Sequence, residues 1–215
     1  MDSDDFSRRQ RDHAGMELTE AGADPDPFVE FGRWYDAAVR FPIEMPNAMV
    51  LATADAHGLP TARFVLMKGW DARGMVFFTH STSTKGNQLE ENPKAALVFY
   101  WAPLHRQVRI EGHVEPVDDA DSDAYFASRP YESRISVWVA DQSSVVPGRE
   151  FLDRRHRELD GQFRGGPVPR PDTWIGYRVA PQRFEFWQGR ENRMHDRLRY
   201  VRADVGGWKL ERLAP

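Results

Sequence analysis

Four residues near the C-terminal end of the chain are of types that bind anions, and they are evenly spaced: Arg193, His195, Arg197 and Arg199. Residues two apart lie on the same face of a β-strand, so a strand here would place all four in one row. Like charges this close repel one another unless an anion lies among them. The spacing therefore indicates a site for a negatively charged ligand, with a solvated strand edge as the ordinary alternative.

Three shorter stretches contain further residues that could bind phosphate. RFVLMK has Arg63 and Lys68 at its ends, in positions of opposite parity that cannot share one face of a regular strand. THSTSTKG gathers hydroxyls before Lys85 at a predicted strand-to-helix junction, where N–H groups and hydroxyls bind phosphate. YFASRP places Tyr125 and Arg129 four apart, on one face of a predicted helix. Taken singly, RFVLMK is explained as well by charges at strand ends, and the other two stretches are explained better by helix capping and by an exposed helix end.

The composition is typical of a folded protein and excludes several kinds of site. Hydrophobic residues make up 40% of the 215 residues and aromatic residues 12%, which is enough for a core in one large domain or two small ones. The absence of cysteine excludes disulfides and thiolate metal ligands. The sequence contains no glycine-rich nucleotide-binding motif, no HExxH and no GxSxG, and its 7 histidines are scattered, so no metal site is expected.

Net charge and hydropathy argue against polymers and membranes as partners. The net charge of -4 and the isoelectric point of about 6.0 speak against nucleic-acid binding through a globally basic surface. No stretch approaches the ~20 apolar residues of a membrane-spanning helix. Because the first residues also lack the apolar run of a signal peptide, a cytoplasmic location is expected.

Charge is unevenly distributed along the chain. Residues 1–31 hold nine acidic residues against three arginines, a net charge of -6. Residues 183–212 hold eight lysines and arginines against five acidic residues, a net charge of +3. A basic C-terminal region in an acidic protein fits a small anionic ligand better than it fits a polymer.

The elements that must hold these residues are predicted from hydrophobic spacing and from turns. Residues 1–24 lack periodicity and are rich in acids, which predicts a flexible N-terminal segment, whereas residues 25–215 are predicted to form one domain. The domain is expected to begin with a helix that has Asp26 as its N-cap, Pro27 at its first position and apolar residues at helical spacing. Further helices are predicted over residues 81–93, 118–130 and 148–163.

Eight short apolar runs, mostly bounded by turn residues, are predicted to be β-strands. The first three are joined by tight Gly-containing turns and predict an antiparallel meander. The run over 107–117 alternates, with Val108 and Ile110 on its apolar face. The other runs cover 48–54, 62–69, 75–80, 95–101, 175–189, 193–203 and 207–213. These runs predict a mainly β domain of the α+β class, with antiparallel strands in a closed or nearly closed barrel and helices at its periphery.

Several motifs together are similar to those of one known family. RFVLMK, FFTHSTSTKG, RQVRIEG, YFASRP, QSS and EFWQGRENRMHDR occur in this order and resemble the pyridoxine (pyridoxamine) 5′-phosphate oxidase family, as does the closing GWKLERLAP. The resemblance covers about residues 26–215, and EFWQGRENRMHDR is its most specific part. It implies an FMN-binding split β-barrel and an obligate homodimer with FMN at the subunit interface.

The resemblance also implies a reaction. Pyridoxine 5′-phosphate or pyridoxamine 5′-phosphate would be oxidised to pyridoxal 5′-phosphate by hydride transfer from C4′ to N5 of FMN. Oxygen would be the final acceptor and give hydrogen peroxide, and the amine substrate would also release ammonia. FMN and the substrate each have a phosphate, which would explain why arginines and lysines recur in an acidic protein.

Roles for individual residues follow from the matched motifs. The resemblance implies that FMN contacts Arg63, Phe64, Val65, Leu66, Met67, Lys68, Phe78, Thr79, Lys85, Gln107, Gln142, Ser143, Trp187 and Arg197. It implies that the substrate contacts Lys68, Tyr125, Arg129, Ser133, Arg193 and His195. Arg63 and Lys85 would bind the FMN phosphate, Gln107 would reach the flavin from the partner subunit, and no metal is implied. Arg193 and His195 are the candidate catalytic residues, over the pyridine ring.

The sequence departs from the family pattern at three places. Thr84 stands where the family usually has an arginine, which removes one cationic contact to the FMN phosphate. The family's N-terminal segment, a candidate substrate lid, matches the divergent QRDH over Gln10–His13. The stretch SRISVW differs at Arg134, Ser136 and Val137, beside the expected substrate pocket.

These departures leave other functions open. One is a related FMN oxidase that acts on a dihydrophenazine, a substrate that should not need a phosphate cradle. A second is a flavin- or pyridoxal-phosphate-binding protein without turnover, and a third is a deazaflavin-dependent reductase. The retained cationic and aromatic residues favour the phosphorylated pyridine substrate: Lys68, Tyr125, Arg129, Arg193 and His195.

Overall fold

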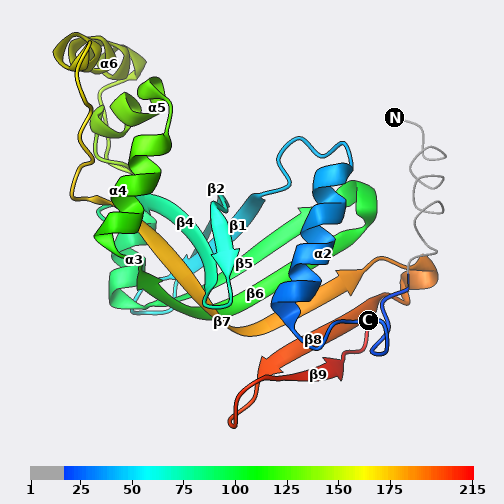
Figure 1. Ribbon diagram of the computed structural model, residues 1–215. Coiled ribbons are helices and arrows are strands. Elements are labelled where there is room, and N and C mark those ends of the chain that lie inside the picture. Colours follow the sequence, from blue (N-terminus) through cyan, green and yellow to red (C-terminus); the bar gives the residue numbers. More distant parts are fainter. Residues whose placement is uncertain (1–16) are drawn as a thin grey trace.

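The computed structural model describes residues 17–215, so the candidate lid at Gln10–His13 lies outside the described residues (Figure 1). The first helix, α2 (Pro27–Arg40), begins as predicted, because the Asp26 side chain accepts a hydrogen bond from the Phe28 N–H at 2.9 Å. Its apolar face buries Phe31 and Trp34 against the sheet.

Nine antiparallel strands form one sheet in the order β2-β1-β5-β6-β7-β4-β3, with β8 beside β7 and β9 beside β8. Their bounds are β1 (Ala48–Ala54), β2 (Pro60–Leu66), β3 (Gly69–Asp71), β4 (Gly74–His80), β5 (Lys94–Trp101), β6 (Arg106–Pro116), β7 (Trp174–Gln188), β8 (Asp196–Arg202) and β9 (Trp208–Arg212). The predicted mainly β fold with peripheral helices is confirmed.

The link between β2 and β3 closes the sheet into a half-barrel. These two strands stand at opposite ends of the strand order, yet only Met67 and Lys68 separate them along the chain. The Met67 N–H donates to the Asn47 carbonyl at 2.9 Å, and the Lys68 N–H donates to the Val76 carbonyl at 2.8 Å. The predicted meander is therefore wrong: β1–β2 and β3–β4 are separate hairpins, and β1 pairs next with β5 and β4 with β7.

The long strand β7 pairs with different strands along its two halves. Its first half pairs with β4 inside the barrel, and its second half, Arg183 to Gln188, pairs with β8 outside it. The change of direction coincides with a bulge in the β6–β7 pairing after Glu111. Gly112 is required there, because a Cβ would lie 2.1 Å from the Ala180 carbonyl oxygen.

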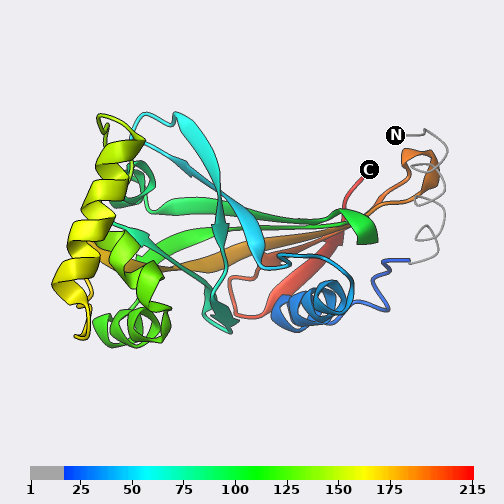
Figure 2. The ribbon, with the colours of Figure 1, turned by 90° about the horizontal axis from the view of Figure 1, so that it is seen from above.

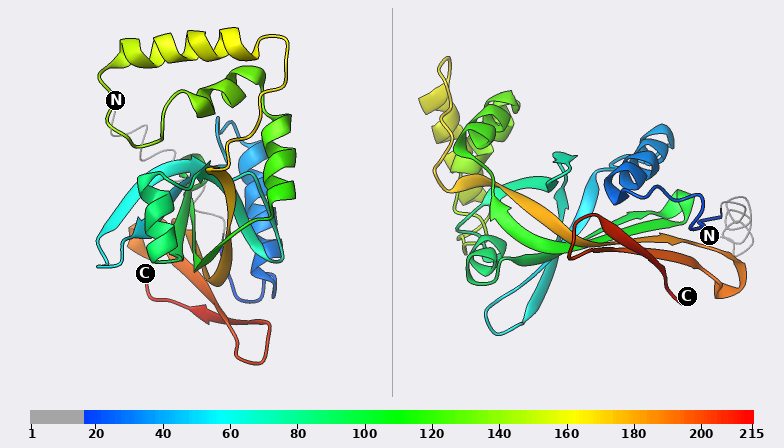
Figure 3. Two further views of the ribbon diagram at one scale, coloured as in Figure 1. Left: turned by 90° about the vertical axis from the view of Figure 1, so that its left-hand side faces the viewer. Right: turned by 60° about the horizontal axis from the view of Figure 1, so that its bottom comes forward.

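The helices gather at two ends of the sheet (Figures 2 and 3). Helices α4, α5 and α6 share a small second core at one end, and α2 covers the other end. The helix α5 was not predicted, since five residues are too few to show periodicity. The bounds are α3 (Thr84–Glu91), α4 (Asp119–Ser128), α5 (Tyr131–Ile135) and α6 (Arg149–Phe163), and the single-turn 3₁₀ helices are η1 (Ala102–Leu104), η2 (Ser136–Trp138) and η3 (Glu191–Arg193).

Residues 17–24, which the sequence grouped with a flexible segment, pack on β8 and β9. Leu18 is buried, and its N–H donates to Asp196 at 3.3 Å. Arg212 binds the Glu20 carboxylate, and the Tyr200 hydroxyl donates to the Asp24 carbonyl at 2.7 Å. None of the helices within residues 17–215 is long and apolar enough to cross a membrane.

Candidate functional site

A cleft of about 960 Å³ opens between the barrel and the helices α4 and α5. It brings together most of the residues that the sequence assigned to cofactor and substrate: Arg63, Phe64, Val65, Leu66, Lys68, Phe78, Thr79, Lys85, Tyr125, Arg129, Ser133, Gln142 and Ser143. Arg63 and Lys68 line the same cleft despite their opposite parity, because β2 ends at Leu66 and the chain turns before Lys68. Met67 instead lies in the core, 3% exposed.

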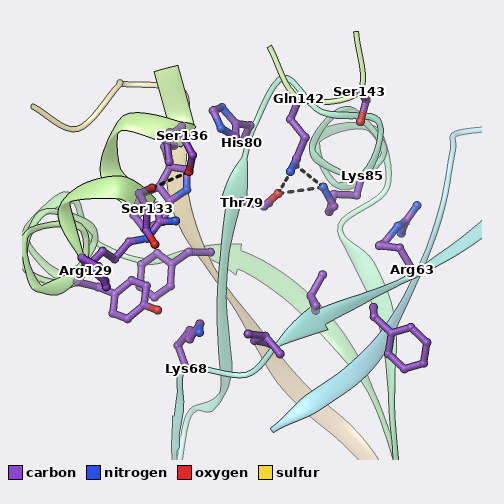
Figure 4. Close-up of a pocket in the computed structure, with 18 of the residues that line it drawn as sticks. Arg63, Lys68, Thr79, His80, Lys85, Arg129, Ser133, Ser136, Gln142 and Ser143 are labelled. Atoms are coloured by element: carbon purple, nitrogen blue, oxygen red, sulfur yellow. Dashed lines mark hydrogen bonds between the residues drawn. The ribbon is translucent and has the colours of Figure 1, made fainter. Parts of the chain in front are cut away.

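Lys85 is the buried cation of one side of the cleft (Figure 4). Its Nζ donates to Gln142 Oε1 at 2.6 Å, to Thr79 Oγ1 at 3.0 Å and to Ser83 Oγ at 3.1 Å. All three acceptors are neutral. Burial, reinforced by the charge of Arg63, lowers the pKa of Lys85 to about 8. The side chain is thus held in place without a counter-charge among residues 17–215.

Arg63 lies beside Lys85 on the same side of the cleft and is also bound only by neutral groups. Its guanidinium donates to Thr53 Oγ1 at 2.6 Å, to the Leu51 carbonyl at 3.3 Å and to the Thr61 hydroxyl. Burial lowers the pKa of Arg63 from its usual value. Within residues 17–215 no carboxylate forms an ion pair with either cation. A buried lysine and a half-buried arginine, neither with a counter-charge, form a site for a dianion.

A second pair of cations, Lys68 and Arg129, occupies the other side of the cleft (Figure 4). The Arg129 guanidinium lies 4.9 Å from the centre of the Trp174 ring, and its buried Nη1 has no hydrogen-bond partner. Lys68 Nζ lies 5.8 Å from the centre of the Tyr125 ring. Neither cation has a carboxylate partner in the described part of the chain. An unpaired buried donor beside a second cation points to an anionic ligand here too.

Stacked aromatic rings separate and support these cations. Phe78 and Tyr125 stack with centres 4.3 Å apart and planes 20° apart, and Phe78 stacks on Trp174 at 5.2 Å and 12°. The three rings come from β4, α4 and β7, so tertiary packing alone brings them together. They give the cleft a flat apolar wall beside Arg129, which suits an aromatic ligand.

The remaining predicted residues lie in a second group, on strands β6, β7 and β8 and in the β7–β8 connection, which we call the sheet-face group: Gln107, Trp187, Arg193, His195 and Arg197. Gln107, Trp187 and Arg197 lie side by side on β6, β7 and β8. The His195 ring lies 4.6 Å from the Trp187 ring, and the Arg190 N–H donates to His195 Nδ1 at 3.1 Å. Nε2 therefore bears the hydrogen in the neutral imidazole, and burial and the Arg193 charge lower the pKa of His195.

The sheet-face group does not line the cleft. The β7–β8 connection that holds Arg193 lies at the opposite end of the sheet from α3 and α4 (Figure 1). The predicted single row of cations is also wrong in part. Only Arg197 and Arg199 are on β8, whereas Arg193 is in η3 with a left-handed backbone, φ 60°.

Two family models together match nearly the whole described chain. One, described as pyridoxamine 5′-phosphate oxidase, matches residues 35–163, and one described as the pyridoxine 5′-phosphate oxidase C-terminal dimerisation region matches residues 174–215. The chain belongs to the pyridoxamine 5′-phosphate oxidase family. The first region holds most of the cleft residues, and the second holds Trp187, Arg193, His195 and Arg197.

Members of this family from several organisms are similar to this chain over nearly their whole length. The pyridoxine/pyridoxamine 5′-phosphate oxidase of Rubrobacter xylanophilus is 51% identical over 98% of this chain and 97% of its own. That of Gloeothece citriformis is 52% identical over 92% of both chains. PhzG from Burkholderia lata 383, solved with tetrahydrophenazine-1-carboxylic acid, is 31% identical with a TM-score of 0.89, over 94% of this chain and 100% of its own.

The cleft of this oxidase-family chain also includes residues that sequence reasoning missed. His80 is 7% exposed with an unpartnered Nδ1, and burial, with the Lys85 charge, lowers its pKa. Strand alternation from Phe78 was the signal that could have placed His80 on the cleft side. No such signal exists for Trp174, Ser128 and Pro130, because their position in the cleft depends on packing between distant elements. The divergent positions Thr84, Ser136 and Val137 line the cleft as well.

Proposed function

We propose that this chain oxidises pyridoxine 5′-phosphate and pyridoxamine 5′-phosphate to pyridoxal 5′-phosphate, with oxygen as the final acceptor. The chain is an FMN-dependent oxidoreductase of its family. The observation that supports the substrate is one cleft with two separate pairs of cations, none of them paired with a carboxylate within residues 17–215. A phosphorylated cofactor and a phosphorylated substrate together need two such sites.

The side of the cleft with Arg63 and Lys85 fits the phosphate of FMN. Lys85 is held by Thr79, Ser83 and Gln142, so it needs little reordering to meet an anion. When bound, FMN would supply the redox chemistry, as the acceptor of a hydride from C4′ of the substrate and the donor of electrons to oxygen. Arg63 and Lys85 bind and orient the group and offset its charge.

The other side of the cleft fits the substrate phosphate. Arg129 offers the unpartnered Nη1, Lys68 adds a second positive charge, and Tyr125 presents its ring against Phe78. Ser133 lines the same side of the cleft. Its backbone carbonyl accepts a hydrogen bond from the Ser136 hydroxyl at 3.0 Å. These groups would fix the phosphate and leave the pyridine ring to be oriented by Arg193 and His195.

We propose a homodimer in which the sheet-face group of one subunit completes the cleft of the other. Arg193 and His195 are remote from the cleft of their own chain, so they can orient a substrate there only from the partner subunit. Residues 174–215, which include both, match a dimerisation region. The same outward face of the sheet exposes large apolar side chains, with Phe64 77% and Tyr100 60% exposed. A monomer would leave this apolar face in water.

A dimer that depends on this face should be broken by a charge on it. Tyr100→Asp is expected to convert the protein largely to monomer and to weaken FMN binding at least about tenfold, because a buried unpaired carboxylate costs several kcal/mol. Tyr100 pairs with Gln107 on the sheet but does not line the cleft. Sedimentation velocity and an FMN titration measure the two effects. Val39→Asp on the exposed side of α2 is the control; a dimeric Tyr100→Asp variant would contradict the assignment of this face.

FMN binding should depend on pH through Lys85. The pKa of Lys85 is about 8 in the ligand-free cleft, and a bound phosphate dianion raises it, so binding takes up a proton above that pH. Affinity for FMN should therefore be steady just below pH 8 and fall as the pH rises through 8, by up to about tenfold per unit. Fluorescence titrations at several pH values measure this, with riboflavin, which has no phosphate, as the control. An equal decline for riboflavin would contradict the assignment.

An aerobic turnover assay tests the proposed reaction. The purified protein with FMN and pyridoxamine 5′-phosphate should release hydrogen peroxide and form pyridoxal 5′-phosphate. The similarity to PhzG supports one second candidate, oxidation of a reduced phenazine. Turnover of a dihydrophenazine with none of pyridoxamine 5′-phosphate would favour that candidate. Binding of FMN with no turnover of either substrate would favour a carrier or sensor.

A further inference from the structure

Arg197 is held at two points by its own chain. Its Nε donates to Glu185 Oε1 at 2.9 Å, and its Nη1 donates to the Ala214 carbonyl at 2.9 Å. The Leu213 N–H returns a hydrogen bond to the Arg197 carbonyl at 2.9 Å. Within residues 17–215 the second amino group, Nη2, donates no hydrogen bond. The guanidinium is thus fixed in place with one amino group left available.

The buried Glu185 carboxylate accepts hydrogen bonds from two arginines. Its side chain belongs to a residue only 9% exposed, on the second half of β7. Oε1 accepts from Arg197, and Oε2 accepts from Arg109 Nη1 at 3.3 Å. Arg109 in turn donates to Glu111 at 2.8 Å. A carboxylate between Arg109 and Arg197 offsets the repulsion between these two cations.

Arg199, two residues along β8, provides a natural comparison. It lies on the same face of β8 as Arg197, and its Nε and Nη2 both donate to Glu211 Oε2, at 3.1 and 2.6 Å. Glu211 belongs to β9, and Arg199 pairs across the sheet with Glu185 rather than with Trp187. The two arginines therefore have similar ion pairs, but only Arg197 is next to the aromatic ring of the sheet-face group.

We propose that Glu185 and two residues that follow β9, Leu213 and Ala214, position Arg197 for FMN. This inference rests on the proposed function, in which Arg197 contacts the cofactor. A free arginine side chain loses rotamer freedom when it binds a ligand, and a side chain already held in place loses less. Glu185 and the chain end would then raise FMN affinity without touching the cofactor. Leu213 and Ala214, which follow β9, thereby contribute to the cofactor site through this one side chain.

A double-mutant cycle on the full-length dimer tests the proposal. Glu185→Gln is expected to weaken FMN binding about tenfold in the otherwise unchanged protein and to have no further effect when Arg197→Ala is also present. Glu211→Gln, which removes the matching partner of Arg199, should leave FMN affinity unchanged. Fluorescence titration of the FMN-free forms measures the affinities of the four proteins of the cycle and of the Glu211→Gln control, and sedimentation velocity reports the oligomeric state.

Each outcome is decisive. An unchanged affinity in Glu185→Gln, an equal loss in the Arg197→Ala background, or a loss explained by dissociation into monomers would overturn the positioning role. A chain shortened to end at Leu213 removes the Ala214 carbonyl from its bond to Arg197 and leaves the buried carboxylate intact, so it tests the same point if Glu185→Gln does not fold. An unaltered protein that fails to bind FMN would instead overturn the proposed function.

Discussion

Replacing Arg193 by alanine is expected to lower kcat for pyridoxamine 5′-phosphate oxidation by roughly 10²–10³-fold, while FMN affinity changes only a few-fold. Arg193 is exposed, has no carboxylate partner within residues 17–215 and lies beside His195, whose pKa it helps to lower. The expected size reflects a group that orients the substrate or stabilises charge in the transition state. Stopped-flow flavin reduction and a steady-state assay measure the effect.

Because of the backbone conformation at Arg193, alanine is a suitable replacement that removes the guanidinium and leaves the backbone energetics unchanged. The residue has φ 60°, a left-handed conformation that costs energy for any residue with a Cβ. Because alanine keeps the Cβ, the cost of the turn stays and the change reports on the guanidinium alone. Arg202→Ala at the end of β8 is the matched control and should keep normal turnover. A loss of FMN affinity as large as the loss of kcat would contradict the assignment of Arg193 to the substrate.

Replacing Lys85 by alanine is expected to have the opposite effect. FMN affinity should fall about 10- to 100-fold, because a hydrogen bond from a buried cation to a phosphate contributes about 1.5–3 kcal/mol. At saturating FMN, kcat should stay within a few-fold of normal, since Lys85 lies on the Arg63 side of the cleft and away from Arg129 (Figure 4). Fluorescence titration and steady-state kinetics separate the two quantities.

Two controls show whether the loss comes from the phosphate contact. Riboflavin affinity should be the same in Lys85→Ala and in the unaltered protein, because riboflavin has no phosphate to bind. Lys94→Ala, which removes an exposed lysine at the start of β5, should change neither affinity. Equal losses for FMN and riboflavin would mean that Lys85 supports the cleft rather than the phosphate.

The sequence by itself determined most of the elements and the residue types of the site. Asp26 and Pro27 set the start of α2 through local capping, and the alternation of Val108 and Ile110 marked the buried face of β6. The order of the motifs identified the family, which the family models and close relatives confirm. The helix cap and the strand alternation depend on neighbouring residues, so they can be predicted from spacing, whereas the family is recognised from the resemblance of whole motifs.

Only the tertiary structure decided how these residues are brought together. The turn after Leu66 places Lys68 beside the cleft that Arg63 lines, and the bend in β7 carries Arg197 away from that cleft. The burial of Lys85 without a counter-charge and the pairing of Glu185 with Arg197 follow from contacts between distant parts of the chain. Spacing along one strand cannot reveal such contacts, because it fixes which residues share a face and not which strands lie beside them.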